Sequence, residues 1–130
     1  MIRLLLSFSL FFANGLIALE YSKGAPAAEV YFITPKNDDI VSGEVVCCWF
    51  LYCINVNGTG HHHLIIDADL PNLTQPIQAD KNHVHFGKGQ TEVKLELEPG
   101  SHTLQLLLGD YRHIPHSPPI YSNKITIVVK

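Results

Sequence analysis

Basic residues are scarce in this sequence, and they form no cluster. Nine lysines and arginines are scattered through 130 residues and are outnumbered by twelve acidic residues, which gives a formal net charge of −3. Proteins that bind nucleic acid gather lysine and arginine on one face. The sequence therefore predicts that nucleic acid is not a partner.

Sulfur-containing residues are also few. Met1 is the single methionine, which argues against a methionine-rich carrier of copper(I). Cys47, Cys48 and Cys53 share one apolar run, and an odd number of cysteines cannot form a complete set of disulfides. In an extended strand Cys47 and Cys53 lie about 20 Å apart, too far for a bond. We expect buried, unreactive thiols, with a strained Cys47–Cys48 bridge or soft-metal binding as alternatives.

Motifs of common catalytic sites are missing. The sequence has no Gly-x-Ser-x-Gly elbow and no phosphate-binding loop. Ser101 precedes His102 and Ser117 follows His116, but sequence neighbours alone do not make a nucleophile, a base and an orienting group. We therefore predict no enzyme activity, with a metal-dependent redox activity left open.

Helical periodicity of useful length is absent beyond the N-terminal stretch, and the pattern is that of an all-β protein. Short apolar or alternating runs are separated by turns rich in proline, glycine and asparagine. The expected strands cover residues 29–34, 41–56, 62–68, 83–86, 91–97, 102–108 and 120–129. The Asn57-Gly58 pair favours a hairpin between the second and third of these strands. About seven strands at this spacing in about 100 residues predict a single immunoglobulin-like β-sandwich.

The N-terminal stretch has the pattern of a signal peptide. Arg3 precedes an apolar stretch that runs to residue 19. Cleavage after Ala18 and cleavage after Ala27 both stay open. We therefore expect residues 1–27 to be the signal peptide, cut between positions 18 and 27. Residues 28–130 then form the β-sandwich domain, periplasmic or secreted and without a membrane span. An uncleaved anchor is the alternative, although the stretch is short for a span.

Histidine is the residue type that points to a site. The chain has eight histidines, and none precedes Gly60. His83 and His85 are two residues apart in an expected strand, so both imidazoles point to one face and can converge on one ion. His61 and His63 repeat this spacing. If the two strands are adjacent, four nitrogens meet.

Strand alternation separates structural histidines from candidate ligands. If Leu64 and Ile66 face the core, His62 is a hydrogen-bonded core histidine, and His61 and His63 face the other way. By the same rule His102 shares a face with the leucines of its strand and is expected to be structural. The candidate acceptors that fix imidazole tautomers are Asp67, Asp80 and Asp110.

Several histidine-containing segments identify a family resemblance. These segments are residues 60–67 (GHHHLIID), 82–92 (NHVHFGKGQTE), 99–110 (PGSHTLQLLLGD) and 113–119 (HIPHSPP). Together with residues 30–35 and 122–127 they resemble a bacterial exported family labelled domain of unknown function 4399. The resemblance implies that all eight histidines belong to family motifs, but it implies no activity. The loop before the histidine triplet is shorter here than is usual in such proteins.

A second, weaker resemblance concerns one strand. Residues 83–87 (HVHFG) resemble the copper-ligand strand of copper–zinc superoxide dismutases, which are also sandwiches of immunoglobulin type. The similarity spans five residues, and neither a zinc-loop pattern nor an equivalent cysteine pair accompanies it. We therefore do not expect dismutase activity.

Two functions of different classes follow. The first is an exported binding module for a divalent transition metal, with copper or zinc as the ion because both accept imidazole ligands. The expected ligands are His61, His63, His83, His85, His113 and His116. The second is a cell-envelope interaction domain that binds no metal. In it the histidines form a hydrogen-bond network that supports loops contacting an envelope protein or a glycan.

Overall fold

The computed structural model describes residues 20–24, 28–52 and 60–130, and within them the chain forms eight strands and no helix. The strands are β1 (Glu29–Thr34), β2 (Ile40–Val41), β3 (Val45–Tyr52), β4 (Gly60–Ile66), β5 (His83–Phe86), β6 (Glu92–Leu95), β7 (Gly100–Asp110) and β8 (Ile125–Val129). Over these residues, no helix is long and apolar enough to cross a membrane. Most of the predicted signal peptide, together with Cys53 and the Asn57-Gly58 turn, lies outside the described residues.

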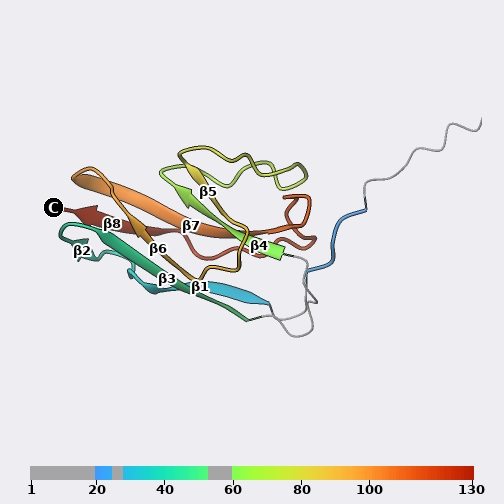
Figure 1. The fold of residues 1–130 in the computed structure, drawn as a ribbon, viewed down its shortest axis with the longest axis horizontal. Helices are drawn as coiled ribbons and strands as arrows, with labels where there is room; N and C mark the ends of the chain where they lie inside the picture. Colours follow the sequence, from blue (N-terminus) through green and yellow to red (C-terminus); the bar gives the residue numbers. More distant parts are fainter. Residues whose placement is uncertain (1–19, 25–27, 53–59) are drawn as a thin grey trace, which may run out of the picture.

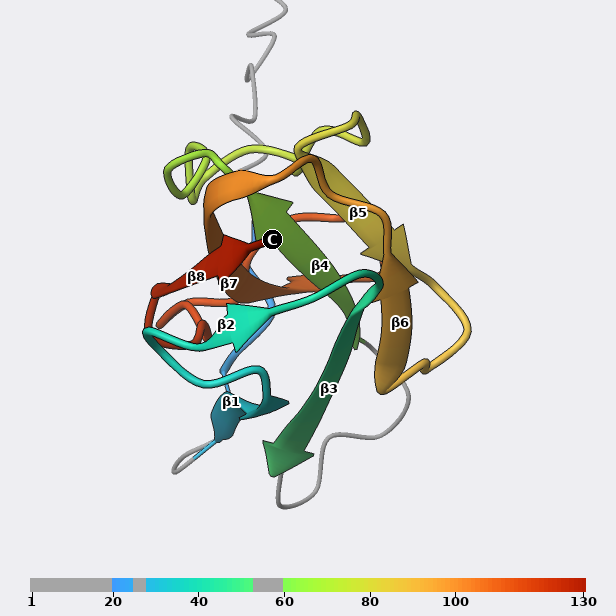
Figure 2. The same cartoon turned by 90° about the vertical axis from the view of Figure 1, so that its left-hand side faces the viewer.

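The strands form two sheets that pack face to face (Figures 1 and 2). One sheet has the order β1-β3-β6, and the other has the order β2-β8-β7-β4-β5. All pairings are antiparallel except β2 with β8, which is parallel. The all-β, immunoglobulin-like sandwich predicted from the strand spacing is therefore confirmed.

The core lies between the sheets and follows from strand alternation. Val45, Cys47 and Trp49 of β3 face Leu64 of β4 and Leu106 of β7, and each is at most 2% exposed. In β8, every second residue from Ile125 to Val129 is buried, as the sequence pattern predicted. This interior packs against β4, which carries His61, His62 and His63, and against β7, which carries His102.

Both faces of β4 are covered at its far end. Leu64 contributes to the interior between the sheets, whereas Ile65 points outward and is only 1% exposed. It packs with Ile77 and Leu107 beneath the long loop between β4 and β5. This second, smaller hydrophobic cluster shields part of the outer face of the larger sheet from solvent, next to the histidines of β4.

The predicted hairpin between the second and third expected strands is wrong. β3 and β4 belong to different sheets, so they do not pair with each other. β3 pairs with β1 and β6, and β4 pairs with β7 and β5. A tight-turn dipeptide reports local backbone preference only, whereas strand partners are decided by which faces the sandwich must bury. The expected strand of residues 41–56 is also divided, because Val41 pairs with β8 in the larger sheet.

The described cysteines carry free thiols. Cys47 is fully buried, and burial raises the pKa of its thiol to about 12, which keeps it protonated. Cys48 is partly exposed, and its Sγ lies 3.4 Å from Glu92 Oε2 as a weak donor. The vicinal bridge is therefore not formed in the structure.

Candidate metal centre

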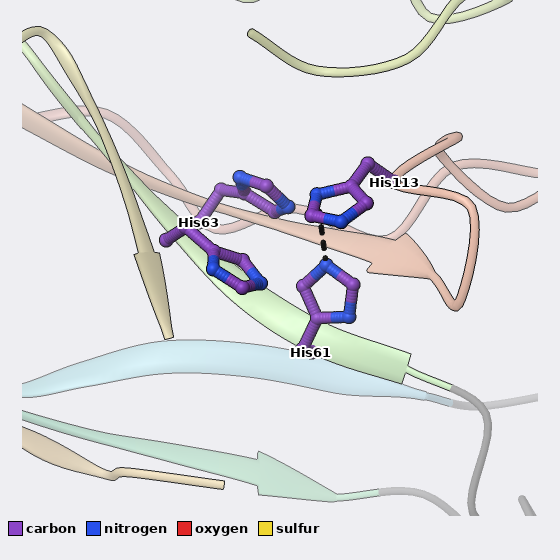
Figure 3. Close-up of side chains that lie close together, drawn as sticks. His61, His63 and His113 are labelled. Atoms are coloured by element: carbon purple, nitrogen blue, oxygen red, sulfur yellow. Dashed lines mark hydrogen bonds between the residues drawn. The ribbon is translucent and has the colours of Figure 1, made fainter. Parts of the chain in front are cut away.

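Four histidines converge on the outer face of the larger sheet. His61 and His63 come from β4, His85 comes from β5, and His113 comes from the loop after β7. One ring nitrogen from each residue lies within 4.8 Å of the corresponding nitrogens of the others. Figure 3 shows His113 reaching over from the loop to the rings of His61 and His63. Three separate segments of the chain thus supply one cluster.

Strand register brings the first three rings together. β4 and β5 pair antiparallel, with His63 directly opposite His85. His61 lies two residues from His63 on the same face, because side chains alternate along a strand. The ring centroids of His61 and His85 are 4.5 Å apart, and those of His63 and His85 are 5.2 Å apart. β4 and β5 are therefore adjacent, which is the condition under which the sequence predicted that their histidines meet.

The fourth ring depends on an unusual backbone conformation. His113 has a φ of 66°, in the left-handed region that histidine seldom occupies. Its centroid lies 4.6 Å from that of His61 and 4.8 Å from that of His85. Such a conformation costs about 1–3 kcal/mol and persists only where surrounding contacts impose it. Those contacts come from the Asp110 carboxylate and from Ile77, whose N–H donates to the His113 carbonyl at 2.8 Å.

Two glycines provide the space that the rings occupy. A Cβ at Gly109, on β7 opposite His61, would stand 3.3 Å from His63 Nε2 and 3.2 Å from Ile77 Cδ1. A Cβ at Gly87 would stand 2.7 Å from His85 Cε1. Sequence reasoning missed both positions, because the need for glycine arises from a neighbouring strand or a folded-back ring. The only sequence signal was that each glycine lies near a histidine segment.

Burial and mutual repulsion keep the inner rings neutral. Burial, reinforced by the neighbouring His85 and His113, lowers the pKa of His61 to about 4. Burial, reinforced by His61, His85 and His113, lowers the pKa of His63 to about 3. A neutral imidazole is the form that ligates a metal ion. His61 and His63 are therefore in the ligating form near neutral pH.

Hydrogen bonding inside the cluster is sparse. His63 is fully buried, yet among the described residues neither of its ring nitrogens has a hydrogen-bond partner. The one contact between members joins His61 Nε2 and His113 Nδ1 at 3.4 Å, with the donor set by the tautomer (Figure 3). An unsatisfied buried polar atom costs about 1–3 kcal/mol. The ring nitrogens of His63 would therefore gain stability from a bound partner.

The donor set fits a divalent transition ion. Tetrahedral zinc with Zn–N bonds of about 2.0–2.1 Å needs nitrogen–nitrogen edges of about 3.4 Å. The four nitrogens lie within 4.8 Å of one another, so they must move closer together to reach these edges. All four donors are imidazoles, which suit zinc and copper, whereas calcium and magnesium require oxygen ligands.

Two of the predicted ligands lie outside this group. His83 shares the outer face, but its Nδ1 is 2.9 Å from Asp80 Oδ1, which also accepts from the His83 backbone N–H. His116 is only 2% exposed, and its Cε1 lies 3.4 Å from where a Cβ of Gly60 would stand. Gly60 shares the interior face of β4 with His62, so His116 lies on the opposite side of the sheet from the cluster.

The two histidines expected to be structural occupy different environments. His62 is 5% exposed and packs edge-on against Trp49 in the interior, with ring centroids 5.8 Å apart. The hydrogen-bond partner expected for it is not found among the described residues. His102 joins the ends of two strands: its Nδ1 is 2.7 Å from Asp67 Oδ2 and its Nε2 is 2.7 Å from the Glu98 carbonyl.

The candidate acceptors do not orient the cluster directly. Asp67 contacts His102, and Asp80 contacts His83. Asp110 is fully buried, and its carboxylate accepts hydrogen bonds from Arg112 and Ser22 rather than from a histidine. Two of the three candidate acceptors, Asp67 and Asp80, therefore pair with histidines outside the cluster.

Comparisons with known proteins place the chain in a family. The family model described as "Domain of unknown function (DUF4399)" matches residues 53–130, more than half of the chain and the part that holds all eight histidines. The chain belongs to this family. Among solved structures, fibronectin(III)-like modules of Clostridium thermocellum CbhA are similar, with a TM-score of 0.48 and 10% identity. That similarity covers 85% of this chain and 47% of the other. No curated protein matches the sequence significantly.

Proposed function

We propose that this DUF4399 domain is a binding module for a divalent transition metal, zinc or copper(II), held by His61, His63, His85 and His113. The observation that carries the proposal is the convergence of four imidazoles from three segments around a buried, unpartnered ring. Solvated histidines have no reason to gather in this way. A metal ion would bind one nitrogen of each ring, including one of the two unpartnered nitrogens of His63, and would offset the strain at His113.

The alternative is a metal-free structural network of histidines, and the contacts support it only elsewhere in the domain. A network requires hydrogen bonds, and the four rings share a single contact within hydrogen-bond distance. His83 and His102, by contrast, each have a carboxylate partner. We assign the structural role to these two residues and the binding role to the cluster.

The test is a titration of untagged protein with zinc(II) and copper(II), in which two alanine variants are compared. His85 and His83 lie on the same strand and the same face, two residues apart, but only His85 belongs to the cluster. We expect His85→Ala to weaken zinc binding about 100-fold and His83→Ala to change it less than about twofold. Both variants are expected to fold, because neither side chain lies in the core.

Three outcomes would count against the proposal. If the wild-type protein binds zinc and copper(II) no more tightly than micromolar, it is not a metal-binding module. Equal losses in the two variants place the ion elsewhere on β5. Affinity that does not weaken as pH falls through about 4, the pKa of His61, contradicts ligation by imidazole, since protons compete for the same nitrogens.

Export remains part of the proposed function. The charged and apolar pattern at the N-terminus supports it, with the mature protein periplasmic or secreted. Expression of the full chain in a bacterial host, followed by fractionation and intact-mass measurement, tests this. A protein that stays in the cytoplasm with its N-terminus uncut overturns export and leaves the metal proposal standing.

A further inference from the structure

The loop that carries His113 is organised by a single buried carboxylate. Asp110 Oδ1 accepts from the backbone N–H groups of Arg112 at 2.8 Å and Ile114 at 3.0 Å. The His113 N–H donates to the Asp110 carbonyl at 2.8 Å. Although burial alone would raise the pKa of Asp110, these bonds and those from the Arg112 and Ser22 side chains lower it to about 2. The carboxylate is therefore charged, and its hydrogen bonds link the start of the loop at Asp110 to the end of the loop at Ile114.

A segment from the other end of the sequence completes these contacts. Ser22 Oγ donates to Asp110 Oδ2 at 2.8 Å, although the two residues are 88 positions apart. The Arg112 guanidinium bridges Asp110 Oδ2 and the Glu20 carbonyl, at 2.9 and 2.7 Å. The segment also pairs with the chain just after the loop, because the Ser117 N–H donates to the Ser22 carbonyl at 3.0 Å. Residues 20–24 thus form a strap across the base of the His113 loop.

We infer that Asp110 and the strap of residues 20–24 are positioning elements of the metal centre. This inference rests on the proposed function, since the role of the strap is to hold His113 in ligating geometry. His113 adopts a backbone conformation that needs external support, and Asp110 makes most of the loop contacts described above, beside the bond from the Ile77 N–H to the His113 carbonyl. Neither Ser22 nor Asp110 hydrogen-bonds to a ring of the cluster. Ser22 acts through the loop, and Asp110 acts through the loop and, more weakly, through its charge near His61.

One consequence concerns where the functional domain begins. The strap lies upstream of Ala28, the start of the expected sandwich domain, and within the range expected for signal cleavage. Cleavage after Ala18 retains the strap, whereas cleavage after Ala27 removes Ser22 and its bond to Asp110. The inference therefore assigns cleavage to the earlier site, with the mature protein retaining Glu20 and Ser22.

The test is a double-mutant cycle on zinc affinity in the full chain. Ser22→Ala and Asp110→Asn are each measured alone and combined with His113→Ala. We expect Ser22→Ala to weaken zinc binding about fivefold and Asp110→Asn at least tenfold. In the His113→Ala background Ser22→Ala has no further effect, because it acts through His113, and Asp110→Asn keeps only the small effect of losing its charge near His61. Tyr21→Phe is the matched control: it removes a bond from the same strap to the Thr74 carbonyl and leaves affinity unchanged.

A second readout needs no metal. Hydrogen exchange at the amides of His113 and Ile114, which are bonded to Asp110, is expected to speed up in Ser22→Ala and not in Tyr21→Phe. Additive losses in the cycle, or unchanged exchange, overturn the positioning role. If wild-type protein binds no zinc, the proposed function fails and exchange alone decides the role of the strap. A mature N-terminus at Ala28, found by intact mass, overturns the assignment of cleavage.

Discussion

Histidines at the two ends of the β4–β7 pair have opposite chemical environments. At the end near Asp67, His102 is held by a carboxylate and a carbonyl, and the pKa of His102 is raised, first by Asp67 and then by the Glu98 carbonyl. At the end near Gly60, no carboxylate hydrogen-bonds to His61 or His63 among the described residues, and burial and the neighbouring imidazoles lower their pKa values. We therefore assign a structural role to His102, which has a carboxylate partner, and a ligating role to His61 and His63, which converge with His85 and His113. Lack of a partner does not by itself mark a ligand, because the buried rings of His62 and His116 also have none among the described residues.

The largest expected difference comes from replacing one histidine at each end by leucine. His63→Leu removes a buried, unpartnered ring, so we expect zinc affinity to fall at least about 100-fold while the metal-free protein becomes about 1 kcal/mol more stable. His102→Leu removes the imidazole partner of the Asp67 carboxylate, which among the described residues keeps only the Thr103 N–H, so we expect a loss of about 1–2 kcal/mol with zinc affinity retained. Urea unfolding and zinc titration measure both. If His63→Leu destabilises the metal-free protein, the claim that the unpartnered His63 ring costs stability is wrong.

The two ends also predict pH dependences of opposite sign for the metal-free protein. Because the pKa of His63 falls from 6.5 to about 3 on folding, the unfolded chain takes up a proton first as pH drops below 6.5. Stability is then lost by about 1.4 kcal/mol per pH unit until the folded pKa is reached. His102 has a raised pKa, so its contribution is complete below the unfolded pKa and is lost as pH rises through the folded one.

Urea midpoints between pH 4 and pH 8 separate these contributions. His63→Leu is expected to flatten the acid side of the profile, and His102→Leu is expected to flatten the side above pH 6.5. A profile that His63→Leu leaves unchanged between pH 4 and pH 6.5 contradicts the neutral, buried state assigned to this ring.

Adding one methyl group beneath the cluster is expected to have an intermediate effect. Gly109→Ala places a Cβ against His63 and Ile77 in a closely packed region, so we expect about tenfold weaker zinc binding and a loss of about 1–2 kcal/mol. Gly87→Ala meets only the exposed His85 ring, which can rotate away, so affinity falls while stability is nearly unchanged. Measurements in the His85→Ala background provide the control, where Gly87→Ala should have no effect on affinity.

The smallest effect is expected at the Asp80–His83 pair. Asp80→Ala removes the exposed acceptor of the His83 ring and of two backbone amides, so we expect a small fall in thermal midpoint. Zinc affinity should change less than about twofold, because His83 is not a member of the cluster. A large loss of affinity would show that this pair belongs to the centre.

Much of the fold was predictable because it depends on local alternation. The strands at residues 29–34 and 83–86 have the predicted bounds, and the inward position of Leu64 and outward position of His63 follow from alternation alone. The sheet partners of β3 and β4 were not predictable from the Asn57-Gly58 pair. Strand pairing depends on contacts between distant segments, which a turn dipeptide does not encode.

The candidate site was predictable in part for the same reason. Two-residue spacing identified the histidine pairs that share a face, but which of them join the cluster depends on the other residues that contact each ring. Asp80 removes His83 from the cluster through a local turn, a signal present in the sequence at three-residue spacing. The roles of Gly109 and Ser22 depend on contacts across strands and across 88 positions, respectively, so no local pattern could reveal them.

X-ray absorption at the zinc edge of the loaded protein tests the central claim most directly. We predict four nitrogen donors at about 2.0–2.1 Å, with the multiple-scattering pattern of imidazole and no sulfur. The His85→Ala variant should lose one imidazole from the fitted shell. A shell with fewer than three imidazoles, or one that includes sulfur or carboxylate oxygen in place of imidazole, would contradict assignment of the ion to His61, His63, His85 and His113.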